Sequence, residues 1–205
     1  MFIASLSFYK KLSKQRSFSI ADFILKLMEK PDANILDFGS GNMYLAERIA
    51  EKLPQTKITG IDVIEDQNFD NNLLVQFPNI SFLKYDGEKI PFDDNTFDYA
   101  VASAVMHHTP DPEYFLSELK RVTKKGGSVI LVEEMYHNLP DKLYIMAEDF
   151  VFNKLKKDVL IPLNFRPYNQ YKNEFIKQEF NVAFEGYVRP SFPWKHHYVF
   201  KLVKV

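Results

Sequence analysis

The stretch Ile35-Leu-Asp-Phe-Gly-Ser-Gly-Asn42 decides the fold of this chain. It starts as a short apolar strand, passes through Gly39 and Gly41, and continues into residues 45–53, where apolar side chains recur at helical spacing. A strand, a Gly-x-Gly turn and a helix bring the polar end of a ligand against free backbone N–H groups at a helix N-terminus. On its own this signal is weak, because any tight turn between a strand and a helix favours glycine.

The residues that follow the turn narrow the choice of ligand. A dinucleotide-binding fingerprint needs Gly or Ala three residues after the second glycine, and this chain has Tyr44 there, which disfavours a dehydrogenase. The Lys-Ser/Thr ending of a phosphate-binding P-loop is also absent. Asp62 closes the next strand, where a carboxylate can accept both ribose hydroxyls of a nucleoside. The alternative is that Asp62 only caps the helix that follows.

Outside this region the chain alternates short apolar strands with helices. A helical segment over the first ~30 residues ends at Pro31. The expected strands are 34–38, 57–62, 80–85, 97–103 and 128–133, the last after a Gly126-Gly127 turn. This alternation predicts an α/β fold with a parallel sheet and helices on both faces. Two helical stretches in ~138–180 precede strands 183–188 and 197–203, which can only pair antiparallel because their connection is short.

Polar side chains gather at the carboxyl ends of the expected parallel strands. Asp86 and Gly87 follow the third strand, where a carboxylate can reach an adenine amino group. The fourth strand ends at Ser103, with His107 and His108 just beyond it. Ligands of open α/β sheets bind at these strand ends, so we expect the glycine turn, the acids and the histidine pair to share one site.

Composition excludes several classes of protein. With 46% hydrophobic and 26% charged residues the chain is expected to be a soluble globular protein that does not span a membrane. The formal net charge is −1, which makes a nucleic-acid partner unlikely. There is no cysteine and no signal-peptide pattern, so the expected location is cytoplasmic. His196 and His197 alternate on a strand and cannot chelate one ion, and we expect no metal.

A series of motifs runs in order along residues ~33 to 133. They are Ile35–Asn42, Ile61-Asp62, Asp86-Gly-Glu-Lys-Ile-Pro-Phe92, Phe97-Asp-Tyr99, His107-His-Thr-Pro-Asp-Pro112 and Leu119-Lys-Arg-Val-Thr-Lys-Lys-Gly-Gly127. As a set they resemble the successive motifs of the class I S-adenosylmethionine-dependent methyltransferases, in the small-molecule branch that includes the quinone-biosynthesis enzymes. The resemblance implies a Rossmann-like seven-stranded sheet, mostly parallel, with an antiparallel C-terminal hairpin.

The resemblance also implies a role for each matching residue. It assigns the methionine half of the cofactor to the glycine turn and Asp37, the ribose to Asp62, the adenine to Val63, Asp86 and Gly87, and the amino-acid tail or sulfonium side to Ser103. The full set of expected cofactor-binding residues is Asp37, Gly39, Ser40, Gly41, Asp62, Val63, Asp86, Gly87 and Ser103. One departure from the family pattern is Met43, which stands where a third glycine is usual.

The implied activity is transfer of a methyl group from S-adenosylmethionine, with S-adenosylhomocysteine as product, to a small-molecule or lipid-like acceptor. His107 and His108 are the candidate catalytic residues, as a base or as groups that orient the acceptor. A protein or nucleic-acid methyltransferase and a non-catalytic cofactor-binding module stay open as alternatives. We expect a single domain over residues 1–205, with a helical cap (1–30), a cofactor-binding core (31–135), a helical insertion over the acceptor (136–180) and a terminal hairpin (181–205).

Overall fold

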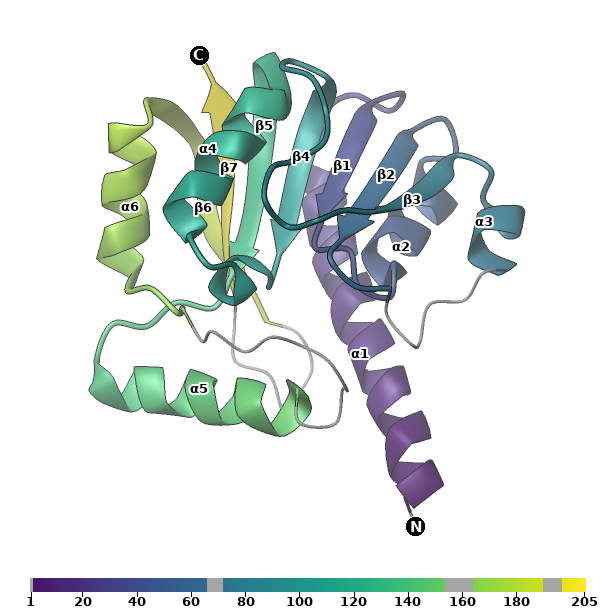
Figure 1. The fold of residues 1–205 in the computed structure, drawn as a ribbon, viewed down its shortest axis with the longest axis vertical. Coiled ribbons are helices and arrows are strands. Elements are labelled where there is room, and N and C mark those ends of the chain that lie inside the picture. The colour runs from purple at the N-terminus through teal and green to yellow at the C-terminus, as the bar shows by residue number, and fades with distance from the viewer. Residues whose placement is uncertain (1, 66–71, 154–163, 190–196) are drawn as a thin grey trace.

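The computed structural model describes residues 2–65, 72–153, 164–189 and 197–205, with side chains from residue 10 onward except those of 151–153. Within these residues the chain forms one seven-stranded sheet in the order β3-β2-β1-β4-β5-β7-β6 (Figure 1). The strands are β1 Asn34–Phe38, β2 Lys57–Asp62, β3 Ile80–Lys84, β4 Phe97–Ser103, β5 Thr123–Glu133, β6 Phe180–Val188 and β7 His197–Lys204. The expected α/β, Rossmann-like sheet is confirmed.

Pairing within the sheet changes direction at one place. Strands β1 to β5 pair in parallel, whereas β7 pairs antiparallel with both β5 and β6. The order of the strands reverses beside β1, which has β2 on one side and β4 on the other. The carboxyl end of β1 is therefore the switch point at which open α/β sheets bind ligands.

Helices cover both faces of the sheet. They are α1 Phe2–Ile24, α2 Tyr44–Lys52, α3 Asn72–Gln76, α4 Pro112–Val122, α5 Leu139–Asn153 and α6 Tyr168–Lys177, with short 3-10 turns at Leu25–Leu27 and Met106–His108. Buried side chains of α1, α2 and α3 share one hydrophobic cluster, and those of α4 and α6 share the cluster on the opposite face. Helix α5 lies across the carboxyl ends of the strands, and the N-terminal part of α1 extends beyond the sheet at the same end (Figure 1).

Local sequence explains where α4 begins. Pro112 occupies the first turn of the helix, where its missing N–H is no loss. The side chain of Asp111 accepts hydrogen bonds from the backbone N–H groups of Glu113 and Tyr114, at 3.0 and 3.1 Å. Such an N-cap satisfies donors that the first turn of a helix leaves open.

The structure corrects the prediction of a turn at Gly126-Gly127. These glycines lie inside β5, which starts at Thr123, and not before it. Pairing with β4 jumps from Phe97↔Thr123 to Tyr99↔Ser128, so the extra residues form an irregularity within the ladder, and Gly126 there has a φ of 73°. Glycine therefore marks a bulge of a continuing strand, a second role that this residue plays in sheets.

Charged side chains tie helix α1 to helix α2 and to strand β7. Lys14 and Asp22 pair with Glu47 and Arg48 of α2, at 2.7 and 2.8 Å. On the other side, Arg16 Nε donates to Nε2 of the fully buried His197 at the start of β7, at 3.0 Å. His196 lies outside the described residues. Among the described residues, no helix is long and apolar enough to cross a membrane.

Candidate functional site

The glycine turn is fixed to the end of β2. The backbone N–H groups of Gly39 and Ser40 both donate to the carbonyl oxygen of Ile61, at 2.9 and 3.0 Å. The N–H of Gly41 donates to Asp62 Oδ2 at 2.9 Å. Gly39 has a φ of 69°, and a Cβ on it would lie 2.1 Å from Val105 Cγ2, so no side chain fits there. The turn is therefore a rigid cradle at the switch point.

Asp37 lies on β1 directly below this turn and is 2% exposed. Its Oδ2 has no hydrogen-bond partner among the described residues. Burial, and secondly the negative charge of Asp62, raise the pKa of Asp37 to about 7. The structure thus brings together the two acids that the sequence places at the ends of β1 and β2. A buried carboxyl group with a raised pKa and an unpartnered oxygen is stabilised in its charged form by a cationic partner.

Asp62 has a structural role that adds to the expected one. Its Oδ2 accepts from Gly41, and its Oδ1 accepts from the N–H of Ile64 at 3.2 Å. Each carboxylate oxygen has two lone pairs, so a carboxylate at this position can accept several hydrogen bonds at once. Asp62 both shapes the turn and presents an acceptor at the strand end.

The third strand end is held beside the second. The N–H of Tyr85 donates to the carbonyl of Asp62 at 3.1 Å. Gly87 has a φ of 82°, and a Cβ on it would lie 2.9 Å from Cγ1 of Val63, so these two residues are in contact. The side chain of Asp86 accepts from the N–H of Glu88 at 2.9 Å, which turns the chain away from β3. Val63, Asp86 and Gly87 therefore form one edge of the site.

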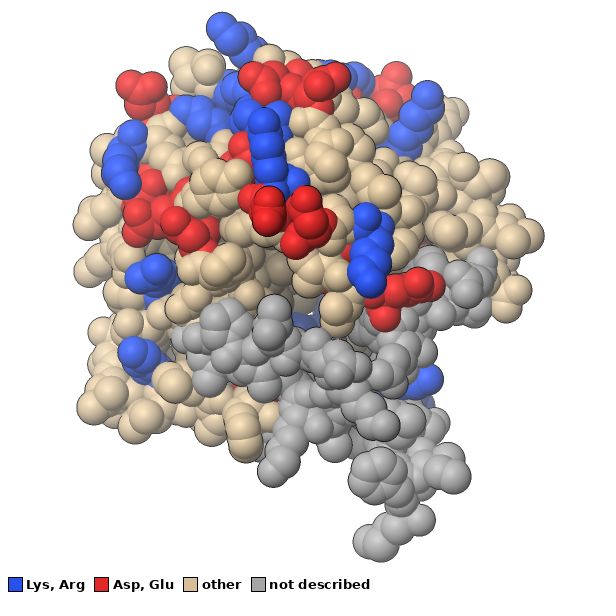
Figure 2. All heavy atoms as spheres, in the orientation of Figure 1, with Lys and Arg blue, Asp and Glu red and all other residues tan. Residues whose placement is uncertain are grey.

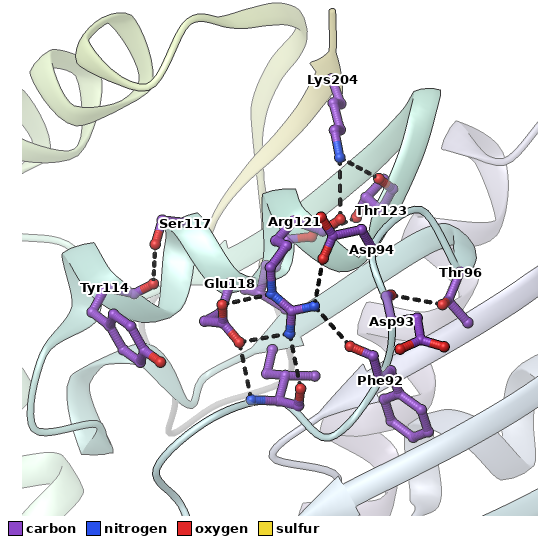
Figure 3. A network of polar contacts seen from close by, with 12 residues as sticks. Phe92, Asp93, Asp94, Thr96, Tyr114, Ser117, Glu118, Arg121, Thr123 and Lys204 are labelled. Atoms are coloured by element: carbon purple, nitrogen blue, oxygen red, sulfur yellow. Dashed lines mark hydrogen bonds and ion pairs between the residues drawn. The ribbon is translucent and has the colours of Figure 1, made fainter.

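A network of polar contacts anchors the segment that follows (Figure 3). Arg121 on α4 donates to the carbonyl oxygens of Ile90 and Phe92, at 2.9 and 2.7 Å. Glu118, one turn earlier, pairs with Arg121 at 2.7 Å and accepts from the N–H of Ile90 at 3.1 Å. These contacts explain why the sequence pattern links 86–92 with 119–127: α4 holds the chain between β3 and β4 in place.

The histidine pair sits in the 3-10 turn after β4. His107 is fully buried, and its Nδ1 lies 2.6 Å from Oε1 of Glu133, the last residue of β5. Phe165 stacks on the His107 ring with centroids 4.2 Å apart and planes 14° apart. Glu133 also accepts from the N–H of Met106 at 2.9 Å. The orientation of the His107 ring is therefore fixed by the Glu133 carboxylate at its edge and by the Phe165 ring on its face.

Asp149 of α5 faces both histidines. Its Oδ1 lies 3.6 Å from Nε2 of His107 and 3.6 Å from Nε2 of His108. Burial lowers the pKa of His107, but the carboxylates of Glu133 and Asp149 outweigh burial and raise the pKa to about 10. The two carboxylates therefore favour a positive charge at His107, from a proton or from another cation.

Sequence reasoning missed two residues of this site: Glu133 and Asp149. Glu133 could have been found, because it ends a buried strand at the same sheet edge as Asp62. Asp149 lies beyond the region of the resemblance and carries no local signal, whereas Phe165 belongs to the segment 136–180 that was expected to cover the acceptor. Ser103 is half-buried at the end of β4, as expected. A further histidine, His137, lies against Tyr198, with 2.5 Å between His137 Nε2 and the phenol oxygen.

Comparison with known proteins shows what the chain is similar to. A family model described as "Methyltransferase domain" matches residues 36–131, which run from β1 into β5 and make up somewhat less than half of the chain. Demethylmenaquinone methyltransferase of Bacillus cereus is 32% identical over 123 residues, which are 53% of this chain and 48% of that protein. The chain therefore spans about half the length of the curated relatives that it matches.

Solved structures show the same fold as the methyltransferase domain. An S-adenosylmethionine-dependent methyltransferase of Aquifex aeolicus superposes with a TM-score of 0.70 at 20% identity, covering 97% of this chain and 98% of that one. The 1,6-didemethyltoxoflavin N1-methyltransferase of Burkholderia thailandensis, solved with S-adenosylhomocysteine, gives 0.69 at 13% identity and covers 100% and 84%. The fold is that of the class I methyltransferases, as the resemblance implied.

Proposed function

We propose that this protein transfers a methyl group from S-adenosylmethionine to a small-molecule or lipid-like acceptor. The observation that carries the proposal is the juxtaposition of Asp37, Asp62 and the rigid Gly39–Gly41 turn at the switch point of a class I sheet. The relatives and structural neighbours that are named as methyltransferases support the same reaction.

The residues at the switch point fit this cofactor. Asp37 offers a buried carboxylate oxygen without a partner among the described residues, which suits the ammonium group of the methionine half. Val105 packs directly against Gly39 and leaves no room for a Cβ there, so the turn keeps its left-handed conformation at the switch point. Asp62 would take the ribose hydroxyls, and Val63, Asp86 and Gly87 would line the adenine. Ser40 and Ser103 complete the proposed set at the methionine side.

The cofactor brings a methyl group on a sulfonium, which is already an excellent leaving group. The chain's own task is to align the acceptor with the methyl–sulfur axis and to exclude water. We assign the orienting role to His107 and His108, because they follow β4 beside Ser103 and because Glu133 and Phe165 fix the His107 ring. The proposed catalytic contribution of this pair is thus mainly geometric.

The character of helix α5 supports an apolar acceptor. Four large hydrophobic side chains of this helix are exposed: Leu139, Leu143, Tyr144 and Phe150. Helix α5 lies across the strand ends, where the acceptor must enter (Figure 1). The name of the bacterial relatives specifies demethylmenaquinone as their acceptor, which agrees with an apolar molecule here. Residues 136–180, together with the helical cap of residues 1–30, would then cover the acceptor.

The other expectations about partners stay predictions. Basic and acidic side chains are interspersed on the face shown in Figure 2, where no large basic patch gathers, which agrees with a partner other than nucleic acid. A cytoplasmic location also stays a prediction. No observation favours a protein or nucleic-acid acceptor, or a non-catalytic role, over the small-molecule reading.

Calorimetric titration with S-adenosylmethionine and S-adenosylhomocysteine tests the cofactor assignment. Asp62→Ala should weaken binding by about 1–3 kcal/mol, because it removes the acceptor for the ribose hydroxyls and releases the Gly41 N–H. Asp32→Ala, an exposed acid at the opposite end of β1, is the matched control and should leave affinity unchanged. Equal affinities of the two variants would refute the assignment, and preference for NADH would refute the proposed reaction class.

A further inference from the structure

We propose that Nε2 of His107, Nε2 of His108 and a carboxylate oxygen of Asp149 bind one divalent first-row transition-metal ion. These three ligand atoms lie within 4.8 Å of one another, although Asp149 comes from α5 and the histidines follow β4. Two imidazoles and one carboxylate are a donor set that suits ions such as Zn²⁺, Fe²⁺ and Co²⁺. This proposal departs from the expectation of no metal, which was drawn from spacing along the sequence, where Asp149 is remote from the two histidines.

The separations between the ligand atoms match a shared ion. Both Nε2 to Oδ1 distances, from His107 and from His108 to Asp149, are 3.6 Å, which is longer than a charge-assisted hydrogen bond of about 2.7–2.9 Å. Two ligands that each lie about 2.1 Å from an ion in tetrahedral geometry are about 3.4 Å apart. Each histidine Nε2 thus stands at the distance from Asp149 Oδ1 that two ligands of one ion would have.

The surroundings of His107 are those of a metal-bound imidazole. In metal sites, the second ring nitrogen of a histidine ligand is held by a carboxylate or a carbonyl oxygen. Here Glu133 takes this place, 2.6 Å from His107 Nδ1, and its own oxygens are fixed by the N–H groups of Met106 and Glu134, at 2.9 and 3.0 Å. Nε2 of His107 is thereby aimed at Asp149. A proton and a metal ion compete for this one position.

The turn that carries the two histidines is also fixed in the backbone. The N–H of Asn164 donates to the carbonyl of His107 at 2.9 Å, and its side-chain amide donates to the carbonyl of Thr109 at 2.8 Å. The side chain of Thr109 in turn donates to the carbonyl of Met106 at 2.7 Å. A preorganised ligand turn of this kind lowers the cost of ordering the site when an ion binds.

Three protein ligands leave at least one coordination position open, as in catalytic metal sites. Because the histidines follow β4 at the strand ends, we assign the open position to an oxygen of the methyl acceptor. This assignment rests on the proposed function. It specifies an acceptor that presents a hydroxyl or carbonyl oxygen, which the ion would bind and orient.

The test is titration of the chelator-treated protein with Co²⁺, followed by visible absorption and calorimetry, with Zn²⁺ as competitor and no S-adenosylmethionine present. We expect one ion per chain. Asp149→Asn should weaken binding at least about tenfold because it removes a ligand charge, and Glu133→Gln should weaken it about ten- to hundredfold through His107. Glu148→Gln, an acid next to Asp149 on the same helix, should bind Co²⁺ like the wild type.

Unfolding temperatures with and without Co²⁺ show whether each variant is folded. The wild type should gain stability from the ion, and Asp149→Asn should not. Absence of stoichiometric binding to folded wild-type protein, or equal binding by Asp149→Asn, would mean that the cluster is only a network of ion pairs and would overturn the proposal. Cofactor affinity measured in the presence of chelator separates the metal site from the proposed function. If the wild type binds Co²⁺ but does not bind S-adenosylmethionine, the proposed function is refuted and the metal site is not.

Discussion

Met43 offers a quantitative test of how the cofactor turn is built. It has a φ of 61° and is the N-cap residue of α2, which explains why the family prefers glycine at this position. Its side chain is fully buried, and a Cβ built on Gly60 would lie 2.3 Å from Met43 Sδ. The methionine thus fills space against β2, among the side chains of α1 and α2. Met43→Gly should relax the backbone but empty this space.

The two effects have different sizes. A left-handed conformation costs a non-glycine residue about 1–2 kcal/mol, and glycine removes that cost. Loss of a buried methionine side chain costs about 2–5 kcal/mol. Helix propensity does not enter, because residue 43 is a cap and not an interior position. We therefore expect Met43→Gly to lower the free energy of unfolding by about 1–4 kcal/mol.

Met43→Ala is the matched variant, since it removes the same side chain and keeps the backbone strain. It should be about 1 kcal/mol less stable than Met43→Gly, after allowance for the greater freedom of glycine in the unfolded chain. Urea denaturation followed by circular dichroism measures both values, with similar m-values as the control for two-state unfolding. A Met43→Gly protein as stable as the wild type would refute the packing role, and an Ala variant equal to the Gly variant would refute the strain.

Three further outcomes are expected. Cofactor binding near pH 6 should release a proton from Asp37, whose pKa is raised to about 7 in the free protein, and calorimetry in buffers of different ionisation enthalpy should detect no such release in Asp37→Asn. Because the pKa of Asp37 is higher in the folded protein than in the unfolded chain, protonated Asp37 stabilises the free protein fully below pH ~4, and this stability is lost as the pH rises through about 7. The free energies of unfolding of the wild type and of Asp37→Asn should therefore diverge over that pH range. Arg121→Ala should lower the free energy of unfolding by about 2–4 kcal/mol, because it leaves the buried Glu118 carboxylate without its partner. Asp94→Ala, on the exposed side of the same network, should lower it by about 1 kcal/mol or less, and chemical denaturation measures both values.

The sequence was sufficient for the fold because local and long-range signals agree. The strand 34–38, the glycine turn and the helix after it are encoded within twenty residues, and each parallel strand is marked by a short apolar run. The antiparallel hairpin followed from the lack of a helix between the last two strands. The glycines at 126–127 misled the prediction because glycine serves both turns and bulges, and the neighbouring strand decides between them.

The site was only partly accessible to the same reasoning. The acids at positions 37, 62 and 86 could be placed together because parallel strands end at one edge. Asp149 could not, since its position depends on how α5 crosses the strand ends, and no local periodicity encodes that path. The second role of Asp62, which ties down Gly41, also needs coordinates, because the sequence does not show which backbone N–H points at the carboxylate.

The place of β7 has a consequence for synthesis of the chain. It is the last strand of this sheet to be synthesised, yet it lies between β5 and β6 in the interior of the sheet. While residues 134–196 are being translated, β5 has a complete partner in β4 on one side and an open edge of backbone N–H and C=O groups on the other. That edge belongs to a strand whose core residues, such as Ile130 and Leu131, are fully buried in the finished protein. Nascent chains are therefore prone to associate edge to edge through β5 until β7 pairs with it. The unpaired edge of β5 is a surface that a chaperone can bind during this interval.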